Sequence, residues 1–237
     1  MNEHLVLCGG TKRAGRAKHL QLALSGKDQN ITLKLEDISR RLVRNLPDRL
    51  VDLLEIATYV FCADRAISRG GEAQTGNGAA WRRRLHFVVP VRDPDHWRRP
   101  EILEALQTTL TFLSDDEYGF EFETAEVENS VQSYLEFTED ESSISPDEIV
   151  LFSGGLDSVA GAVEELSRDM SIALVSHRSS PKTYSHQKAL VADLQRRFPG
   201  KVMHFPVLIT RLEGLRAPET TQRTRSFLYS TLACVIA

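Results

Sequence analysis

The sequence predicts two domains: an α+β domain over residues 1–137, and the first part of a doubly wound α/β domain with a parallel sheet over residues 148–237. Two observations carry this prediction. Apolar strands and amphipathic helices alternate strictly after residue 148, whereas strands and two helices are mixed before residue 137. Between them, residues 138–147 (TEDESSISPD) form an acidic, polar stretch with a proline, which is typical of a linker.

The N-terminal pattern predicts a sheet covered by two helices. Apolar residues recur at three-to-four spacing from Leu50 to Ile67, which is typical of an amphipathic helix. A second helix is expected over residues 100–113, with Pro100 in its first turn. Strands are expected over residues 31–35, 85–91, 120–124 and 133–137.

The C-terminal pattern predicts three strands that alternate with three helices. Strands are expected over residues 148–152, 172–176 and 202–207, and helices over residues 158–168, 185–198 and from residue 225. The chain stops within the apolar helical pattern SFLYSTLACVIA, without a polar cap or a glycine. We therefore expect the chain to be the front part of a longer protein.

The composition is typical of a globular protein without a membrane span. Of 237 residues, 41% are hydrophobic and 26% are charged, which is enough apolar side chain for a core. No run of about 18 apolar residues occurs, and a formal net charge of −4 argues against nucleic acid as a partner. Three scattered cysteines fit neither a disulfide framework nor a metal site. We expect a cytoplasmic protein.

Several charged clusters are expected to be solvated and not to form sites. The arginines of Trp81-Arg82-Arg83-Arg84 fit an exposed face or a protein-docking surface better than a nucleic-acid site, since the chain is acidic overall. The acidic run of residues 114–117 is expected to be a loop after a helix. Asp64 and Arg65 are expected to form an ion pair on a helix face, and Glu219 is expected to face solvent.

The turn Ser153-Gly154-Gly155-Leu156-Asp157-Ser158 lies between a strand end and a helix start, which is the context of an anion-binding loop. Glycines allow the backbone to approach an anion closely, and amides at a helix N-terminus point at phosphate oxygens. The carboxylate of Asp157 would repel a bare phosphate, so it indicates a Mg²⁺ ion or a cap. In the alternative interpretation, Asp157 or Ser158 is only the N-cap of a helix after a tight turn.

This turn resembles the SGGxDS loop of the PP-loop ATP pyrophosphatases, with Val159 in place of the usual final Ser or Thr. The resemblance implies a fold like the adenine nucleotide alpha hydrolases, in which the loop holds the β- and γ-phosphates of ATP and a substrate oxygen attacks the α-phosphate. It implies ATP contacts from Phe152, Ser153, Gly154, Gly155, Leu156, Asp157 and Ser158, with Asp157 also catalytic and able to bind Mg²⁺. It places the adenosine near Ser176 and His177, although His177 also fits a solvated loop.

Within that superfamily, residues 221–228 (TQRTRSFL) resemble a helix start of the QueC (7-cyano-7-deazaguanine synthase) family. Arg225 stands at the family arginine, which implies a catalytic role beside the phosphates, and Ser226 stands where asparagine is usual. The family adenylates the carboxylate of 7-carboxy-7-deazaguanine, which ammonia converts to an amide and then a nitrile in queuosine biosynthesis. It also implies Zn²⁺ in a C-terminal cysteine cluster, which we expect only beyond residue 237.

Segments of the N-terminal sequence, such as Asp52-Leu53-Leu54-Glu55 and Val89-Pro90-Val91-Arg92, are similar to extended QueC-like proteins of bacterial anti-phage gene clusters of the Qat and CBASS types. This similarity implies an antiviral defence role, in which a protein amine of a defence complex accepts the activated deazaguanine. Two alternatives stay open. The enzyme amidates or thiolates a tRNA base or a small metabolite, or the chain is an inactive scaffold that senses nucleotide. A homodimer is compatible with each.

Overall fold

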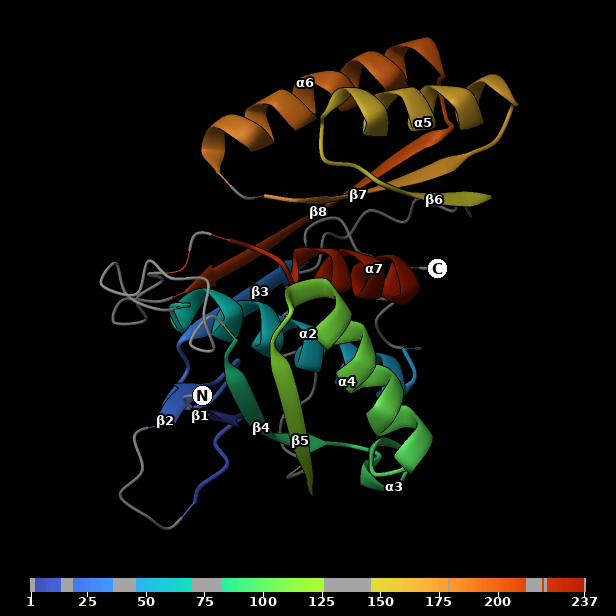
Figure 1. Ribbon diagram of the computed structural model, residues 1–237. Helices are drawn as coiled ribbons and strands as arrows, with labels where there is room; N and C mark the ends of the chain where they lie inside the picture. Colours follow the sequence, from blue (N-terminus) through green and yellow to red (C-terminus); the bar gives the residue numbers. More distant parts are fainter. Residues whose placement is uncertain are drawn as a thin grey trace. The chain divides into compact units, whose positions relative to one another are not determined.

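The computed structural model describes residues 3–13, 19–35, 46–69, 82–125, 146–178, 180–211, 219 and 221–236. These residues form an alternating α/β fold with two four-stranded sheets (Figure 1). The chain divides into two compact units. The first unit comprises Met1–Thr32, Pro47–Ser133 and Arg211–Leu228, and the second comprises Leu33–Leu46, Tyr134–Thr210 and Tyr229–Ala237. The predicted linker lies outside the described residues apart from Pro146 and Asp147, so the predicted domain boundaries stay a prediction.

The sheet of the first unit has the order β2-β1-β4-β5, and each neighbouring pair of strands is parallel. Its strands are β1 (Glu3–Cys8), β2 (His19–Leu22), β4 (Arg84–Val91) and β5 (Glu117–Thr124). The expected α+β arrangement is therefore wrong for this sheet. Parallel neighbours need crossover connections, and the helices expected from the sequence provide them between β2 and β4 and between β4 and β5.

Three helices accompany this sheet: α2 (Asp48–Ala66), α3 (Pro94–Trp97) and α4 (Pro100–Ser114). Both helices expected from the sequence are confirmed, and α4 starts with Pro100 at its first position. Helix α2 is buried on nearly every side, including Val51, Ile56 and Phe61. Its pattern is that of a core helix and not of a surface helix with one apolar stripe.

Asp64, Arg69, Arg83 and Asp116 form one cluster of buried ion pairs inside the first unit. The two aspartates are 0% exposed and Arg83 is 3% exposed. Arg69 and Arg83 each donate to Asp116 Oδ2 at 2.6 Å. The expectations of a surface ion pair at Asp64 and a solvated Arg83 are wrong, because these charges neutralise one another in the core. Asp115 and Asp116 do lie in the loop between α4 and β5, as expected, although Asp116 is buried.

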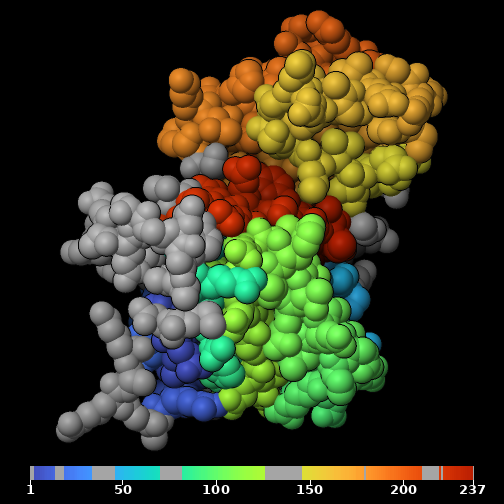
Figure 2. Space-filling model, in the orientation of Figure 1, coloured from blue at the N-terminus to red at the C-terminus, as the bar shows by residue number. Residues whose placement is uncertain are grey.

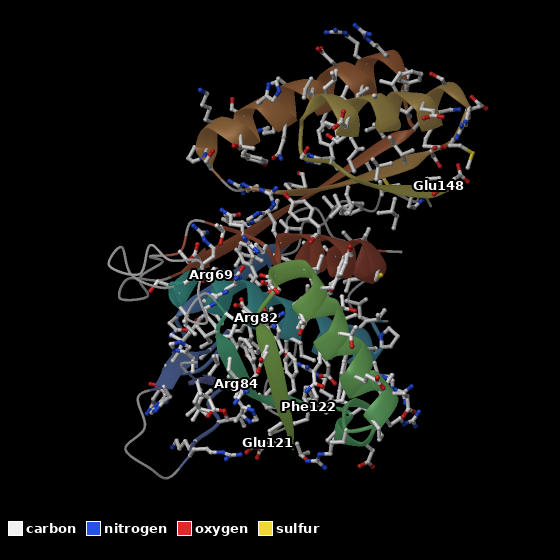
Figure 3. All side chains as sticks on the ribbon, viewed as in Figure 1. Arg69, Arg82, Arg84, Glu121, Phe122 and Glu148 are labelled. Atoms are coloured by element: carbon white, nitrogen blue, oxygen red, sulfur yellow. The ribbon has the colours of Figure 1, made fainter. Side chains whose placement is uncertain are left out.

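Arg82 and Arg84, on either side of Arg83, do lie on the surface, as expected (Figure 3). They form exposed ion pairs with Asp115 and Glu117 respectively. The alternation follows from the extended backbone, in which neighbouring side chains point to opposite sides. One arginine of the three is thus part of the core, and the other two are solvated.

The sheet of the second unit has the order β3-β8-β7-β6, and β7 is parallel to both of its neighbours, β6 and β8. Its strands are β6 (Glu148–Leu151), β7 (Ile172–His177), β8 (Val202–Arg211) and β3 (Ile31–Leu35). All six residues of β7 are buried, as a strand covered on both faces requires. The strand expected over residues 31–35 is confirmed, but it belongs to this sheet.

The helices α5 (Leu156–Ser167) and α6 (Pro181–Arg197) lie on the same face of this sheet (Figure 1). They form much of the visible surface of the second unit (Figure 2). Beneath them, Phe152, Leu166, Leu174 and Val191 belong to one apolar core. Helix α6 starts four residues earlier than expected, because Ser180 accepts from Thr183 N as an N-cap and Pro181 fits the first helical position.

The last helix of the chain, α7 (Arg225–Ile236), confirms the helix expected from residue 225. Leu228, Leu232 and Val235 are buried on it, at three-to-four spacing. Within the described residues, none of the helices is long and apolar enough to cross a membrane.

Candidate functional site

The predicted loop connects β6 to α5 at the carboxyl end of the parallel strands. Phe152 is fully buried in the core of the second unit, and its backbone N–H donates to Val175 O at 2.7 Å. Gly154 follows with a φ of +82°. An added Cβ at Gly154 would lie 3.1 Å from Gln187 Cγ. Only glycine therefore fits this position without strain.

The N-terminus of α5 carries no side-chain cap. Its N-cap residue is Gly155, and Asp157 is the second residue of the helix, within its first turn. The alternative in which Asp157 or Ser158 caps the helix is therefore wrong. The first amides of a helix lack partners within the helix, so the α5 amides stay available to an external acceptor. An anion is the acceptor that the helix dipole favours there.

The two serines of the loop form a small hydrogen-bond network around the turn. Ser153 Oγ lies 3.2 Å from Ser158 Oγ and accepts from Gly155 N at 3.2 Å. Ser158 Oγ donates to Gly155 O at 2.9 Å. Leu156 is 84% exposed, and Asp157 is exposed as well. The loop thus presents hydroxyls, amides and one carboxylate to solvent, which are the groups that a phosphate and its counter-ion need.

Side chains of helix α6 contact the loop and hold its backbone in place. Gln187 Nε2 donates to Ser153 O at 3.0 Å, although Gln187 is only 1% exposed. His186 and Leu190 also lie within 4 Å of the position that a Cβ of Gly154 would take. The conformation of the loop is therefore fixed both by its own serines and by a packed helix.

Ser176 and His177 lie at the carboxyl end of β7, in the same unit as the loop. His177 is 3% exposed, and its ring meets the Tyr229 ring edge-on with centroids 5.9 Å apart. The alternative of a solvated loop residue is therefore wrong for His177. The structure brings both residues to the strand end that holds the loop, and their contact with adenosine stays a prediction.

A histidine that the sequence analysis did not single out is joined to Ser176. His204 Nε2 on β8 lies 2.6 Å from Ser176 Oγ. Burial, together with the smaller effect of the charge of Lys188, lowers the pKa of His204 to about 4. The imidazole is therefore neutral at neutral pH, and its hydrogen bond to the hydroxyl is one between uncharged groups.

Arg225 belongs to the first unit and is exposed at the start of α7. Thr224, directly before it, donates through its N–H and its hydroxyl to Asp64 Oδ2. The preceding Glu219 is buried and accepts from Arg69 N and from Thr221, so the expectation of a solvent-facing Glu219 is wrong. The first unit thus anchors the start of α7, and a role of Arg225 at the loop stays a prediction.

No clustered metal site occurs in the described part of the chain. In these residues, no group of three or more His, Cys, Asp or Glu side chains is placed to hold a metal ion. The free cysteines Cys8 and Cys62 are buried, and Cys234 is exposed. A metal ion at the loop would therefore have Asp157 as its carboxylate ligand and would share its remaining sites with bound ligand oxygens and water.

Gln187 and His204 were missed because their signal is indirect. Each is a polar residue at a position where the local pattern of buried residues expects an apolar one. Gln187 precedes Val191 and Leu194 on the buried stripe of α6, and His204 lies on β8, an inner strand of the sheet. A polar residue within an otherwise apolar helix stripe or strand is the pattern that would have indicated them.

Neither a protein-family model, nor a curated protein, nor a solved structure matches this chain. The structure itself establishes an alternating α/β fold with two mostly parallel four-stranded sheets. It places an exposed glycine loop at a strand end of the second sheet.

Proposed function

We propose that the loop of residues 153–158 binds the phosphates of ATP with Mg²⁺, and that the protein transfers AMP to a carboxylate. The observation that carries this proposal is the uncapped N-terminus of α5 directly after Gly154, whose φ is +82°. This geometry leaves amides, two hydroxyls and an exposed carboxylate at one turn. In α/β proteins, ligands bind outside the carboxyl ends of parallel strands, which is where this turn lies.

Different residues would bind different parts of the nucleotide. The amides of the first turn of α5 and the hydroxyls of Ser153 and Ser158 donate to phosphate oxygens. Asp157 holds Mg²⁺, whose charge offsets both the carboxylate and the phosphates. Ser176 and His177, at the neighbouring strand end, line the place of the nucleoside. The resemblance to the QueC family implies that Arg225 offsets the charge that develops in the transition state.

The reaction follows from the motif and not from a bound ligand. A carboxylate oxygen of the substrate attacks the α-phosphorus, the bond to the bridging oxygen of the β-phosphate breaks, and pyrophosphate leaves with both electrons of that bond. An amine then attacks the acyl carbon and AMP leaves, which gives an amide. The resemblance to the QueC family favours 7-carboxy-7-deazaguanine as the acid, with further conversion to a nitrile when the amine is ammonia.

The resemblance to extended QueC-like proteins favours a second choice of acceptor. In that case a protein amine takes the activated deazaguanine in anti-phage defence, and the product is a modified protein. A mass increase on a partner protein after incubation with ATP and the acid would identify this acceptor. The absence of any mass increase, with free amide formed instead, would assign the acceptor as ammonia.

Binding of Mg·ATP to the Asp157→Ala variant tests the proposal. The matched control is Asp193→Ala, which removes an exposed aspartate from α6 in the same unit. We expect calorimetric affinity for Mg·ATP to fall at least about tenfold in D157A, and to stay unchanged in D193A. Equal affinity in the two variants would contradict the role of Asp157.

Pyrophosphate release distinguishes an enzyme from a nucleotide-sensing scaffold. We expect the full chain with Mg·ATP to release pyrophosphate only when a suitable carboxylic acid is present. Tight binding of ATP without release, across a panel that includes 7-carboxy-7-deazaguanine, would favour the scaffold.

A further inference from the structure

The buried face of α6 consists of Gln187, Val191 and Leu194, and one of these three residues is polar. Val191 and Leu194 pack in the apolar core of the second unit. Gln187 continues the same stripe toward the carboxyl end of the strands, where the loop begins. Its side chain is therefore held between the helix and the loop, and only 1% of the residue is exposed.

The two ends of the Gln187 carboxamide differ in their partners. Nε2 donates to Ser153 O at 3.0 Å, whereas Oε1 is buried without a hydrogen-bond partner. A buried acceptor without a partner costs stability, and an apolar side chain of the same shape would avoid this cost. Stability alone therefore does not account for a glutamine here, and its contact with the loop does.

That contact determines the direction of an amide in the loop. The peptide bond between Ser153 and Gly154 is trans and planar, so its C=O and N–H point in opposite directions. Because the carbonyl points at Gln187, the N–H of Gly154 points away from α6. The Cγ of Gln187 also lies 3.1 Å from the place of a Cβ on Gly154, so the glutamine restricts the peptide on two sides.

We propose that Gln187 is a positioning residue for the phosphate loop: it holds the Ser153 carbonyl and thereby directs the Gly154 N–H toward a phosphate oxygen of the bound nucleotide. This inference rests on the proposed function of the loop. It assigns to α6 a part in anion binding that the motif alone does not contain. The ligand class is a polyphosphate, since the directed group is a single backbone donor that adjoins the donors of the α5 N-terminus.

The test compares Gln187→Met with Gln195→Met. Gln195 lies on the same helix, and its Nε2 also donates to a backbone carbonyl, that of Val202, at 3.3 Å. Both variants lose one such bond, but only Q187M loses the bond to the loop. We expect Q187M to bind Mg·ATP and inorganic tripolyphosphate about tenfold more weakly than the wild type, and Q195M to bind both within about twofold of the wild type.

A second measurement separates positioning from a structural role. We expect the melting temperature of Q187M to stay near that of the wild type, because the variant also removes the unpartnered Oε1. A lower melting temperature with unchanged affinity of the folded protein would overturn the inference. Gln187→Glu keeps the shape but lacks the donor and adds a negative charge, so we expect weaker binding than in Q187M, with a difference that shrinks at high salt.

The outcomes distinguish this inference from the proposed function. Wild-type affinity in both Q187M and Q187E would overturn the inference alone. Weaker tripolyphosphate binding in both variants, without any pyrophosphate release from ATP by the wild type, would support the inference and count against the enzyme. A wild-type chain that binds neither Mg·ATP nor tripolyphosphate would overturn both.

Discussion

The substitution Gly154→Ala alters the loop at the residue whose backbone conformation is least tolerant of a side chain. A left-handed backbone costs a residue with a Cβ roughly 1–2 kcal/mol, and the φ of Gly154 is +82°. The new Cβ would also lie 3.1 Å from Gln187 Cγ, so Gln187 must shift and weaken its bond to Ser153 O. Loss of that bond costs about 1 kcal/mol. Together these costs amount to about 2–3 kcal/mol against the present loop conformation.

If this conformation is the one that binds polyphosphate, the same free energy appears in the affinity. We expect the dissociation constant of Mg·ATP for G154A to rise about 30- to 150-fold, since 1.4 kcal/mol is about a factor of ten. The matched control is Gly161→Ala on α5, where an added Cβ meets nothing within 4 Å. Titration calorimetry on both variants gives the comparison. Wild-type affinity in G154A would refute the reasoning, and so would an equal loss in G161A.

Three further results follow from the charges and hydrogen bonds of the two units. The pKa of His204 is lowered to about 4 in the folded protein, so the unfolded chain takes up a proton first as the pH falls below about 6.5. The contribution of His204 to stability should therefore be full above about pH 6.5 and decline toward about pH 4. His204→Gln should flatten this decline in hydrogen-exchange measurements on β7. Asp64→Asn leaves two buried arginines short of one carboxylate, and should cost about 3–5 kcal/mol in a denaturation followed by the fluorescence of buried Trp97. Asp115→Asn, in an exposed pair of the same unit, should cost less than about 1 kcal/mol in that assay, and an equal loss in the two variants would contradict the distinction between core and surface ion pairs.

The order of the helices and strands was accessible from the sequence because their patterns are local. Apolar periodicity located α2, α4, α5, β4 and β7 to within a few residues. The four-residue strand β2 was missed, since it is too short to show a period. Without it, and with β3 assigned to the wrong sheet, the parallel topology of the first unit was misread as α+β. Sheet membership depends on contacts distant in sequence, which a local pattern does not contain.

The loop was predicted from its residues, but its supports were not. The motif of Gly154, Asp157 and the two serines is recognisable in the sequence alone. The structure gives it the strand-to-helix context that such a motif requires. Gln187 lies 34 residues from its partner Ser153. Asp64 lies 160 residues from Thr224. Such partners are determined by packing between distant segments of the chain. For this reason, charged residues that the local sequence predicted to be solvated are buried in the fold.

Phosphorus-31 NMR of the products of ATP tests the central claim most directly. The full chain is incubated with ATP, Mg²⁺ and 7-carboxy-7-deazaguanine, with D157A in parallel. We predict resonances of AMP and pyrophosphate for the wild type, and their loss in D157A. Resonances of ADP and inorganic phosphate, or unchanged ATP under conditions where the nucleotide is bound, would contradict AMP transfer at the loop.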